Sequence, residues 1–468
     1  MRRHTMLALV VAAALAAAAC SGGDDNAGPA GPDDEVTDAS RCPVDALESE
    51  PGPVEITLWH AMTAANETTL QALVDDYNAT QDRVEVRLVF KGTYTETLEG
   101  YRSAARGGEL PNLVQLEETA IQQLVDSETA IPAAACIEAS GFDTSDLLPR
   151  VLDQFTVVDT LWPMPFNTSN PVLYFNKRDF VEAGLDPEDP PATLAELREA
   201  SQAIVDTNAA NQGFALEMQS WYLEQLFATS GQEVVDEANG RDARATEALL
   251  DSDAGLAVFT WVDEMLSGGL AANVGRNPGG QDAFLAIASG DAAMTLGTSA
   301  ALGSIYDVLA SNPDLAAKVD LGVAPMPTID EAGSGGVNVG GAALWLVDTG
   351  TDAEKAAAWD FASWLTLPAQ QARWHIGTGY VPISEQAALD PAVAALWAQR
   401  PGFRVAFDQL QASQGPAGPV LGGYPDFREA VTQGLERIAE GADPAESLAE
   451  TDAEATAAIQ DYNRRVGG

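Results

Sequence analysis

Basic side chains are scarce in this sequence of 468 residues. It has 24 Lys and Arg against 70 Asp and Glu, a formal net charge of −46, and its only lysines are Lys91, Lys177, Lys318 and Lys355. Such an excess of carboxylates repels polyanions, which excludes nucleic acid as a routine partner. The acidity fits either a salt-rich habitat or a codon bias toward Ala, Gly and Arg.

Groups for catalysis or metal binding are also few. The three histidines are His4, His60 and His375, and no Cys/His cluster has the spacing of a metal site. The chain contains no HExxH, GxSxG or GxxxxGK(S/T) pattern. The sequence therefore predicts a protein that is not an enzyme and that needs no cofactor or metal. A secreted phosphodiesterase is a remote alternative, because it would require one of these missing sets.

Long apolar runs are absent except near the N-terminus, where a basic start is followed by 14 apolar residues and then by Cys20. This run is too short to span a bilayer comfortably and is typical of a signal peptide, here residues 1–19. Small residues before Cys20 and a polar stretch after it predict a lipoprotein whose tether covers residues 20–53; cleavage without lipidation is the alternative. We therefore expect an extracytoplasmic protein that its lipid anchors to the cell membrane.

Only two cysteines remain in the mature chain, Cys42 and Cys136. In an exported protein the oxidising compartment favours a disulfide between them, and two free thiols are the alternative. The bond would join the end of the tether to the first part of the folded chain.

Strand and helix patterns alternate through the rest of the chain. Residues 54–60 and 83–90 have strand patterns around a helical pattern at 66–80, which predicts a parallel sheet covered by helices. A second set of such elements starts near residue 194, and from residue 352 onward the pattern is almost wholly helical. We therefore expect an α/β protein with two lobes and a helical C-terminal part.

A polar loop and an apolar strand meet at the centre of this pattern. Residues 167–170 are polar, and residues 172–175 form a short strand after Pro171. Because Pro171 favours an extended conformation at the residue before it, Ser169 keeps its hydroxyl and N–H free of any helix. We interpret the stretch as a crossover between two lobes that begins with a ligand-facing loop; an ordinary strand after a polar loop is the alternative.

Several stretches, taken together and in order, resemble the extracellular solute-binding proteins of ABC importers. They are ITLWHAM (56–62), FKGTYTETL (90–98), PFNTSNPVLYFNKRDFVEAGLDPEDPP (165–191), GDAAMT (290–295), GGAALWLV (340–347), WHIGTGYVPIS (374–384) and LGGYPDFREAV (421–431). The combination is specific to the branch of this family that binds glycerol phosphates, and the resemblance covers nearly the whole mature chain.

The resemblance implies a two-lobed periplasmic-binding-protein fold, class II type, with three crossovers at the hinge. It implies that residues 54–172 and 296–348 form the N-terminal lobe, and that residues 173–295 and 349–468 form the C-terminal lobe. In that family the lobes close over a small molecule, and the closed state delivers the molecule to the transmembrane subunits of an ABC permease. We expect the protein to act as a monomer.

The resemblance also identifies ligand-contacting residues, position by position. They are Tyr94, Glu118, Ser169, Trp221, Thr298, Gly341, Tyr380 and Arg428, and Ser299 could serve in place of Thr298. One departure concerns Met218, which stands where the glycerol-3-phosphate receptor has the first of two tryptophans that line the cleft.

Several of these residues also have an ordinary structural interpretation. Arg428 can hold two oxygens of a phosphate as a fork, or it can form a surface ion pair. Glu118 can accept hydrogen bonds from polyol hydroxyls, or it can only favour a helix N-terminus. Trp221 can shield the apolar face of a ligand or belong to the core, and Met218 can leave room for a head group or fill the core.

We therefore expect a binding lipoprotein for a phosphate ester, either a glycerophosphodiester such as glycerophosphocholine or glycerol-3-phosphate. The diester is the predicted preference, because it carries one negative charge where a phosphomonoester carries about 1.5 to 2. A receptor for a sugar or a polyol is the alternative within the same family.

Overall fold

The structure is a computed structural model that describes residues 38–277, 282–333 and 335–467. The predicted signal peptide and the predicted lipidation site, Cys20, lie outside the described residues. Within those residues, no helix combines the length and the apolar character that a membrane span requires.

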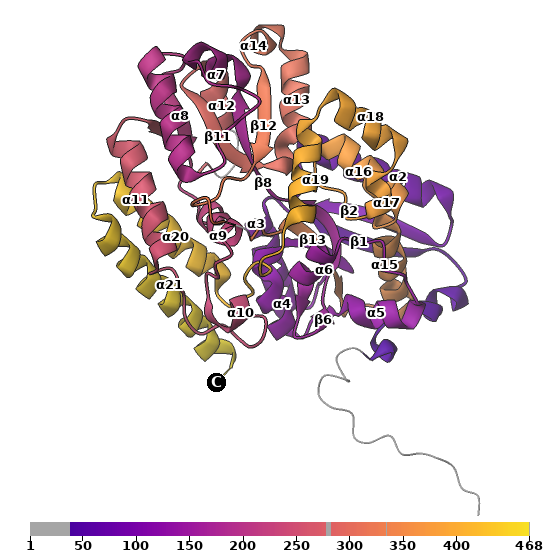
Figure 1. The fold of residues 1–468 in the computed structure, drawn as a ribbon. Coiled ribbons are helices and arrows are strands. Elements are labelled where there is room, and N and C mark those ends of the chain that lie inside the picture. The colour runs from indigo at the N-terminus through magenta and orange to yellow at the C-terminus, as the bar shows by residue number, and fades with distance from the viewer. Residues whose placement is uncertain (1–37, 278–281, 334, 468) are drawn as a thin grey trace, which may run out of the picture.

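Two separate β-sheets, each covered by helices, form two lobes (Figure 1). The sheet of the first lobe has the order β2-β1-β3-β13-β4, and β7 also pairs with β13. Its strands are β1 (Val54–His60), β2 (Val84–Phe90), β3 (Leu113–Glu117), β4 (Ala130–Ile131), β7 (Met164–Ser169) and β13 (Gly340–Val347). The sheet of the second lobe has the order β10-β9-β11-β8-β12. Its strands are β8 (Pro171–Asn176), β9 (Gln212–Leu216), β10 (Ala271–Asn273), β11 (Ala292–Thr298) and β12 (Leu321–Pro325).

Both sheets combine parallel and antiparallel pairs. In the first, β1 runs parallel to β2 and β3, whereas β13 runs antiparallel to β3 and β7. In the second, β9 runs parallel to β10 and β11, whereas β8 runs antiparallel to β11 and β12. Every residue of β7 and β8 is buried. The two-lobed α/β architecture expected from the sequence is therefore confirmed, and the two strands that lead from one sheet to the other are buried along their whole length.

Helices cover both sheets. On the first lobe they are α2 (Ala64–Thr80), α3 (Tyr94–Gly107), α4 (Ile121–Ser127), α5 (Ala133–Ser140), α6 (Pro149–Phe155), α15 (Asp352–Leu365) and α16 (Pro368–Thr378). On the second they are α7 (Lys177–Ala183), α8 (Leu194–Thr207), α9 (Ser220–Thr229), α11 (Asp253–Ser267), α12 (Asp282–Ser289), α20 (Tyr424–Ala439) and α21 (Pro444–Val466). Other helices are α10 (Asp236–Gly240), α13 (Leu302–Ser311), α17 (Glu385–Ala388), α18 (Pro391–Gln399) and α19 (Gly402–Ala412). A capping box, in which an N-cap threonine and a glutamate three residues later satisfy each other's backbone N–H, starts α3, α8 and α15.

The sheets divide the chain differently from the boundaries expected from the sequence. Those boundaries place residues 296–348 wholly in the first lobe, but β12 pairs with β8 in the second sheet. They also place residues 349–468 in the second lobe, but α15 packs against β1 and α16 against α2, both in the first lobe. The physical reason is that a buried strand or an apolar helix face shows that a partner exists without showing which sheet supplies it.

The crossover predicted around residue 170 is present, but residues 167–169, which were expected in a polar loop, lie in the buried strand β7 and pair with β13. Only Asn170 separates β7, in the first sheet, from β8, in the second. Its backbone N–H donates to Ser299 Oγ at 3.2 Å, its Nδ2 donates to the Ala406 carbonyl at 2.7 Å, and its Oδ1 accepts from Gln409 Nε2 at 2.9 Å. A buried amide with both ends satisfied fixes the path of the chain here. The chain crosses again between β12 and β13 and returns to the second lobe before α20.

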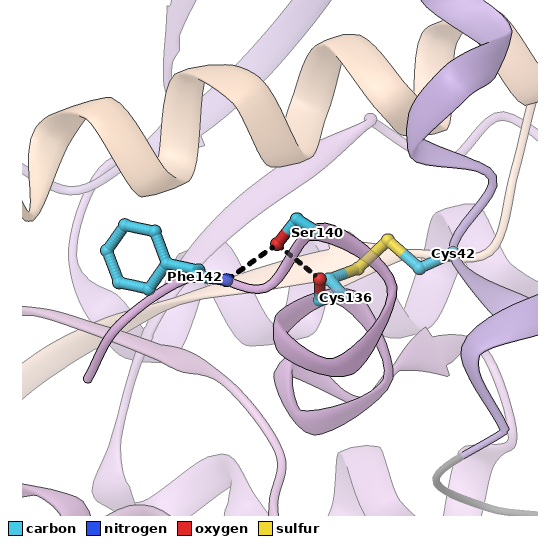
Figure 2. The surroundings of a disulfide bond; sticks show 4 residues. All are labelled: Cys42, Cys136, Ser140 and Phe142. Carbon is cyan, nitrogen blue, oxygen red and sulfur yellow. Dashed lines mark hydrogen bonds between the residues drawn. A yellow bond between two sulfur atoms is a disulfide. The ribbon is translucent and has the colours of Figure 1, made fainter.

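A disulfide joins Cys42 to Cys136 (Figure 2). Cys42 follows a short 3-10 helix at Ala39–Arg41, and Cys136 lies on α5 of the first lobe, with the two Cα atoms 5.0 Å apart. Ser140 Oγ donates to the carbonyl of Cys136 at 2.7 Å and accepts from the N–H of Phe142 at 3.3 Å. The bond fastens the first described residues to the first lobe.

Candidate ligand-binding site at the lobe junction

A buried ion cluster joins the two lobes. Arg428, near the start of α20, donates from Nε and Nη2 to the two oxygens of Glu224, both at 2.9 Å, and from Nη2 to Glu118 Oε1 at 2.8 Å. Glu118 lies on the 3-10 helix η3 (Glu118–Ala120) that follows β3 in the first lobe, whereas Glu224 lies on α9 in the second. The side chains of Arg428, Glu118 and Glu224 are 20%, 7% and 2% exposed. One guanidinium therefore holds a carboxylate from each lobe.

Two further groups of the second lobe hold Glu224 in place. Ser220 Oγ, one turn earlier on α9, donates to Glu224 Oε1 at 2.8 Å, and the hydroxyl of Tyr424 donates to Oε2 at 2.8 Å. Burial alone would raise the pKa of Glu224, but the attraction of Arg428 and these hydrogen bonds outweigh burial, so the pKa is lowered. Glu224 is therefore an ionised partner of Arg428 at neutral pH.

Glu118 shows the opposite shift. Burial raises its pKa to about 7, the attraction of Arg428 opposes the increase, and the charge of Glu117 adds to it. Two carboxylates and one guanidinium carry a net charge of −1 when both carboxylates are ionised, and zero when Glu118 is protonated. The charge of the lobe junction therefore changes near neutral pH.

Tyr94 and Tyr380 form a second pair, within the first lobe. Tyr94 begins α3, Tyr380 follows α16, and their hydroxyl oxygens lie 3.2 Å apart. Asn167 on β7 donates from Nδ2 to Tyr94 Oη at 2.9 Å, and the Tyr380 ring stacks on Trp374 with 5.5 Å between centroids. Burial raises the pKa of Tyr380, and the charge of Glu118 adds to the increase, so the tyrosine pair lies within electrostatic reach of the ion cluster.

Strand β13 meets the second lobe through a glycine. Gly340 pairs with Ser169 on β7, and a Cβ at Gly340 would lie 2.8 Å from Trp221 Cζ2 and 3.4 Å from Ser169 Oγ. Its neighbour Gly341 has a φ of 91°, and a Cβ there would lie 2.0 Å from the Asn167 carbonyl oxygen. Trp221, on α9, therefore packs against the backbone of the first lobe beside the Ser169 hydroxyl, at a place where only glycine fits.

Three other predicted site residues have roles within the fold. Thr298 Oγ1 accepts from the N–H of Ala300 at 3.2 Å, and fully buried Ser299 accepts from the N–H of Asn170 at the crossover. Met218 is 1% exposed and lines a small apolar cavity inside the second lobe together with Trp261. This position favours the core interpretation of Met218 over a contact with a head group.

The structure thus brings together several of the predicted residues. Glu118 bonds to Arg428, Tyr94 bonds to Tyr380, and Ser169 lies beside Trp221. The sequence reasoning missed Glu224, although a single acidic residue in the mostly apolar helix SWYLEQLFAT was a usable signal. It also missed the buried amides Gln115 and Asn167 behind the tyrosine pair. Among the residues that the structure describes, no group of three or more His, Cys, Asp or Glu is arranged to hold a metal ion.

The chain matches a family model and curated relatives over most of its length. Residues 72–401 match the model of the bacterial extracellular solute-binding protein family. The sn-glycerol-3-phosphate-binding periplasmic protein UgpB of Yersinia pestis bv. Antiqua (strain Antiqua) is 32% identical over 399 residues, covering 82% of this chain and 87% of that protein. UgpB of Rhizobium meliloti (strain 1021) is 28% identical over 396 residues, covering 83% and 89%.

Solved structures share the two-lobed fold. UgpB from Mycobacterium tuberculosis in complex with glycerophosphocholine aligns with a TM-score of 0.73 at 21% identity, covering 89% of this chain and 100% of that chain. The cyclic alpha-maltosyl-1,6-maltose binding protein from Arthrobacter globiformis aligns with a TM-score of 0.71 at 23% identity, covering 88% and 100%. The family match over residues 72–401 and the 32% identical relative together show that this chain belongs to the bacterial extracellular solute-binding proteins.

Proposed function

We propose that this protein is the substrate-binding component of an ABC importer and that it captures a glycerophosphodiester or glycerol-3-phosphate between its lobes. Curated relatives that bind glycerol-3-phosphate and a structural neighbour that holds glycerophosphocholine support this class of ligand. Ligand contacts from both lobes lower the free energy of the closed state, which the permease then recognises. The role requires binding and release without any chemical step.

The observation that carries the proposal is the arrangement of Arg428 between the lobes. An arginine has five N–H donors, and three of them bond to Glu118 and Glu224. The guanidinium also lies over the Tyr424 ring, 4.7 Å from its centroid, and the two N–H groups of Nη1 donate no hydrogen bond to the described residues. They can donate to phosphate oxygens, while the carboxylates keep the guanidinium in place. A phosphate ester bound there would be held by a residue on which both lobes converge.

The fixed charges favour a diester over a monoester. With Glu118 ionised, the cluster of two carboxylates and Arg428 carries −1, within a chain of net charge −46. A phosphomonoester adds about 1.5 to 2 further negative charges, and a diester adds only one. The whole-chain field is screened over about 8 Å at physiological salt, so the cluster itself contributes the larger part of this preference.

A cationic head group on the diester could also contact the ring face of an aromatic side chain. Trp221 is half-buried beside Ser169, where the two lobes meet. A trimethylammonium group over an indole gains about 0.5 to 2 kcal/mol, depending on how far it is desolvated. Glycerophosphocholine, which carries both charges, is therefore the ligand that we propose first.

A receptor for a sugar or a polyol is the second candidate. Arg428 is already neutralised by two carboxylates, and such clusters of carboxylate and guanidinium can bind hydroxyl groups without any ligand charge. Aromatic side chains such as Trp221 and Tyr380 would then cover the faces of a sugar ring.

Titration calorimetry on the mature chain separates these candidates. Glycerophosphocholine, glycerol-3-phosphate and maltose are titrated in the same buffer. We expect the tightest binding for glycerophosphocholine, weaker binding for glycerol-3-phosphate and no measurable heat for maltose. Tighter binding of glycerol-3-phosphate than of the diester would overturn the preference, and binding of maltose alone would establish the sugar receptor.

We further propose that the N-terminal segment ends in a lipid anchor at Cys20. The small residues that precede Cys20 and the polar residues that follow it support this assignment. An anchored receptor stays close to its permease after the ligand is released.

A further inference from the structure

A chain of hydrogen bonds leads from the backbone of the first lobe to the tyrosine pair. The N–H of Ala61 donates to Gln115 Oε1 at 3.2 Å, and Gln115 Nε2 donates to Asn167 Oδ1 at 2.7 Å. Asn167 Nδ2 then donates to Tyr94 Oη at 2.9 Å, and Tyr94 Oη lies 3.2 Å from Tyr380 Oη. Both amide side chains are 0% exposed. This relay lies entirely within the first lobe, and its central bond, between Gln115 and Asn167, is buried.

The direction of the relay is determined by its first member. A backbone N–H can only donate, so the oxygen of the Gln115 amide must point to Ala61 and its NH₂ group must point to Asn167. The Asn167 oxygen then faces Gln115, and its NH₂ group faces Tyr94. Assignments of amide orientation normally depend on such partners, and here one unambiguous donor fixes both amides.

This direction decides what the tyrosine pair can offer. Tyr94 accepts from Asn167, so neither phenolic proton is needed to satisfy the amide. One of the two protons lies between the rings, and the other has no further partner among the described residues. With the amides reversed, Tyr94 would donate to Asn167 and Tyr380 would donate to Tyr94, and only lone pairs would remain. The relay therefore makes the pair a hydrogen-bond donor.

We infer that Gln115 and Asn167 are positioning residues that orient the Tyr94–Tyr380 pair as a hydrogen-bond donor to an anionic oxygen of the ligand. The inference depends on the proposed function, because a phosphoryl oxygen is the acceptor that needs such a donor. Neither amide touches the ligand. Both act through the tyrosines, whose rings are fixed in turn: the Tyr380 N–H donates to Thr378 Oγ1 at 3.1 Å, and its ring stacks on Trp374.

The substitution Gln115→Glu tests the direction without changing the shape of the side chain. An ionised Glu at this position would accept from Ala61 and also from Asn167, which would turn the Asn167 amide and reverse the relay. A protonated Glu would donate to Asn167 and restore it. Burial raises the pKa of a carboxyl at such a position, so both states are reached between about pH 5.5 and pH 9.

The measurement is the ratio of the Kd of the variant to the Kd of the wild type for glycerophosphocholine across this pH range. Titratable groups near the relay are His60, Tyr94, Tyr380, Glu117 and Glu118, and they are present in both proteins. We expect a ratio near one at the acid end and of about ten or more at the alkaline end, since a bond to a charged acceptor is lost. Gln386→Glu, at an exposed position on α17, is the matched control and should give a ratio near one throughout.

A ratio that does not change with pH would overturn the inference, as would an unchanged affinity at pH 9. If the wild type binds glycerophosphocholine and the ratio stays flat, only the relay fails; if the wild type binds no phosphate ester, the proposed function fails and the inference fails with it. Circular dichroism monitors folding of each variant.

A second set of variants keeps the test decisive if Gln115→Glu does not fold. In either Tyr94→Phe or Tyr380→Phe, the remaining phenol keeps a free proton for the ligand. Each single variant should therefore lose affinity only about two- to threefold, and the double variant more than about tenfold. If the fold-loss of affinity in the double variant equalled the product of the two single losses, the two tyrosines would not share one donor.

Discussion

The guanidinium of Arg428 makes its bidentate contact with the carboxylate of Glu224, so the edge that makes this contact is not available to a ligand. This edge consists of Nε and Nη2, Nη2 also donates to Glu118, and the two N–H groups that remain lie on Nη1. A buried charge without its counter-charge is costly, so the cluster keeps the guanidinium charged and oriented while the site is unliganded. Selectivity at this site is then a matter of how much additional negative charge the cluster accepts.

Arg428→Ala should weaken the binding of glycerophosphocholine by about 2 to 5 kcal/mol, because the phosphate loses its only cationic donor in the cluster. Calorimetry measures the loss. Arg404→Ala is the control, since the Arg404 side chain is 61% exposed and forms an ion pair with Asp408 on the same helix, away from the ion cluster. The melting temperature of both variants is measured as well, because Arg428→Ala leaves Glu118 and Glu224 without their ion-pair partner and can lower stability. A loss below about 0.5 kcal/mol would assign Arg428 to a purely structural ion pair.

The raised pKa of Glu118 predicts a pH dependence of stability. Its pKa rises from 4.5 to about 7 on folding, so the folded protein binds this proton more tightly than the unfolded chain between those values. The resulting stability is complete below about pH 4.5 and is lost as the pH rises through 7, a difference of about 3 kcal/mol. The free energy of unfolding of Glu118→Gln, measured with urea, should therefore fall less between pH 5 and pH 8 than that of the wild type. Glu138→Gln, at an exposed position on α5, is the control, and identical declines in Glu118→Gln and the wild type would contradict the assignment.

The side chains of the site were predictable to different degrees. Arg428 and Glu118 could be named because their motifs resemble a family that uses those positions. Glu224 could not, because its role depends on how α9 docks against α20, and sequence spacing does not encode that docking. Met218 shows the reverse problem: a substituted position in a site motif can belong to the core, and only its 1% exposure reveals this.

Among the elements, the crossover from β7 to β8 was the most predictable. A proline before an apolar run imposes an extended path, and the strand predicted at 172–175 occurs as part of β8. The polar loop predicted before it is wrong, because residues 167–169 belong to the buried strand β7. The assignment of β12 and of α15 to lobes was not predictable in the same way. Both depend on pairing or packing with residues more than a hundred positions away in sequence, such as β8 for β12 and β1 for α15.

The disulfide should stabilise the first lobe. It joins residues 94 positions apart, and closing a loop of this size restricts the unfolded chain strongly. Replacing both cysteines by serine should lower the free energy of unfolding by about 2 to 4 kcal/mol, as measured by urea denaturation. Mass spectrometry after alkylation without reductant provides the check: modification of two thiols in the native wild type would show that the bond is absent from the protein in solution.

In the whole molecule, a second contact links the lobes away from Arg428. Asp126 on α4 accepts from Arg244 at 2.6 and 2.8 Å and from the hydroxyl of Tyr462 on α21 at 2.9 Å. The side chain of Asp126 is 11% exposed and that of Arg244 is 38% exposed, so the contact is shielded on the side of the first lobe only. The contact favours the arrangement of the lobes seen in the structure whether or not ligand is present.

Arg244→Gln should therefore shift the unliganded protein toward a more open form and weaken ligand binding by about 0.5 to 1 kcal/mol. Small-angle X-ray scattering measures the first effect as a larger radius of gyration, and calorimetry measures the second. Arg87→Gln removes an exposed ion pair with Glu55 inside the first lobe and is the control. An unchanged radius in the Arg244 variant would show that the contact does not influence closure.

Membrane attachment should depend on one residue. Cys20→Ser should move the protein from the membrane fraction to the soluble fraction, because the variant lacks the thiol to which the proposed lipid is attached. Immunoblots of the two fractions make the measurement. Retention of the variant in the membrane fraction would refute the lipoprotein assignment.

The position of the Cys42–Cys136 bond also has a mechanical consequence. A pull on the N-terminal segment enters the folded protein at α5, in the first lobe, and reaches the second lobe through the crossing segments and the contacts between the lobes. The force therefore acts on the first lobe, and the second lobe can move relative to the first without moving the N-terminal segment. If the N-terminal segment were attached to the second lobe instead, a force on this segment would also change the angle between the two lobes.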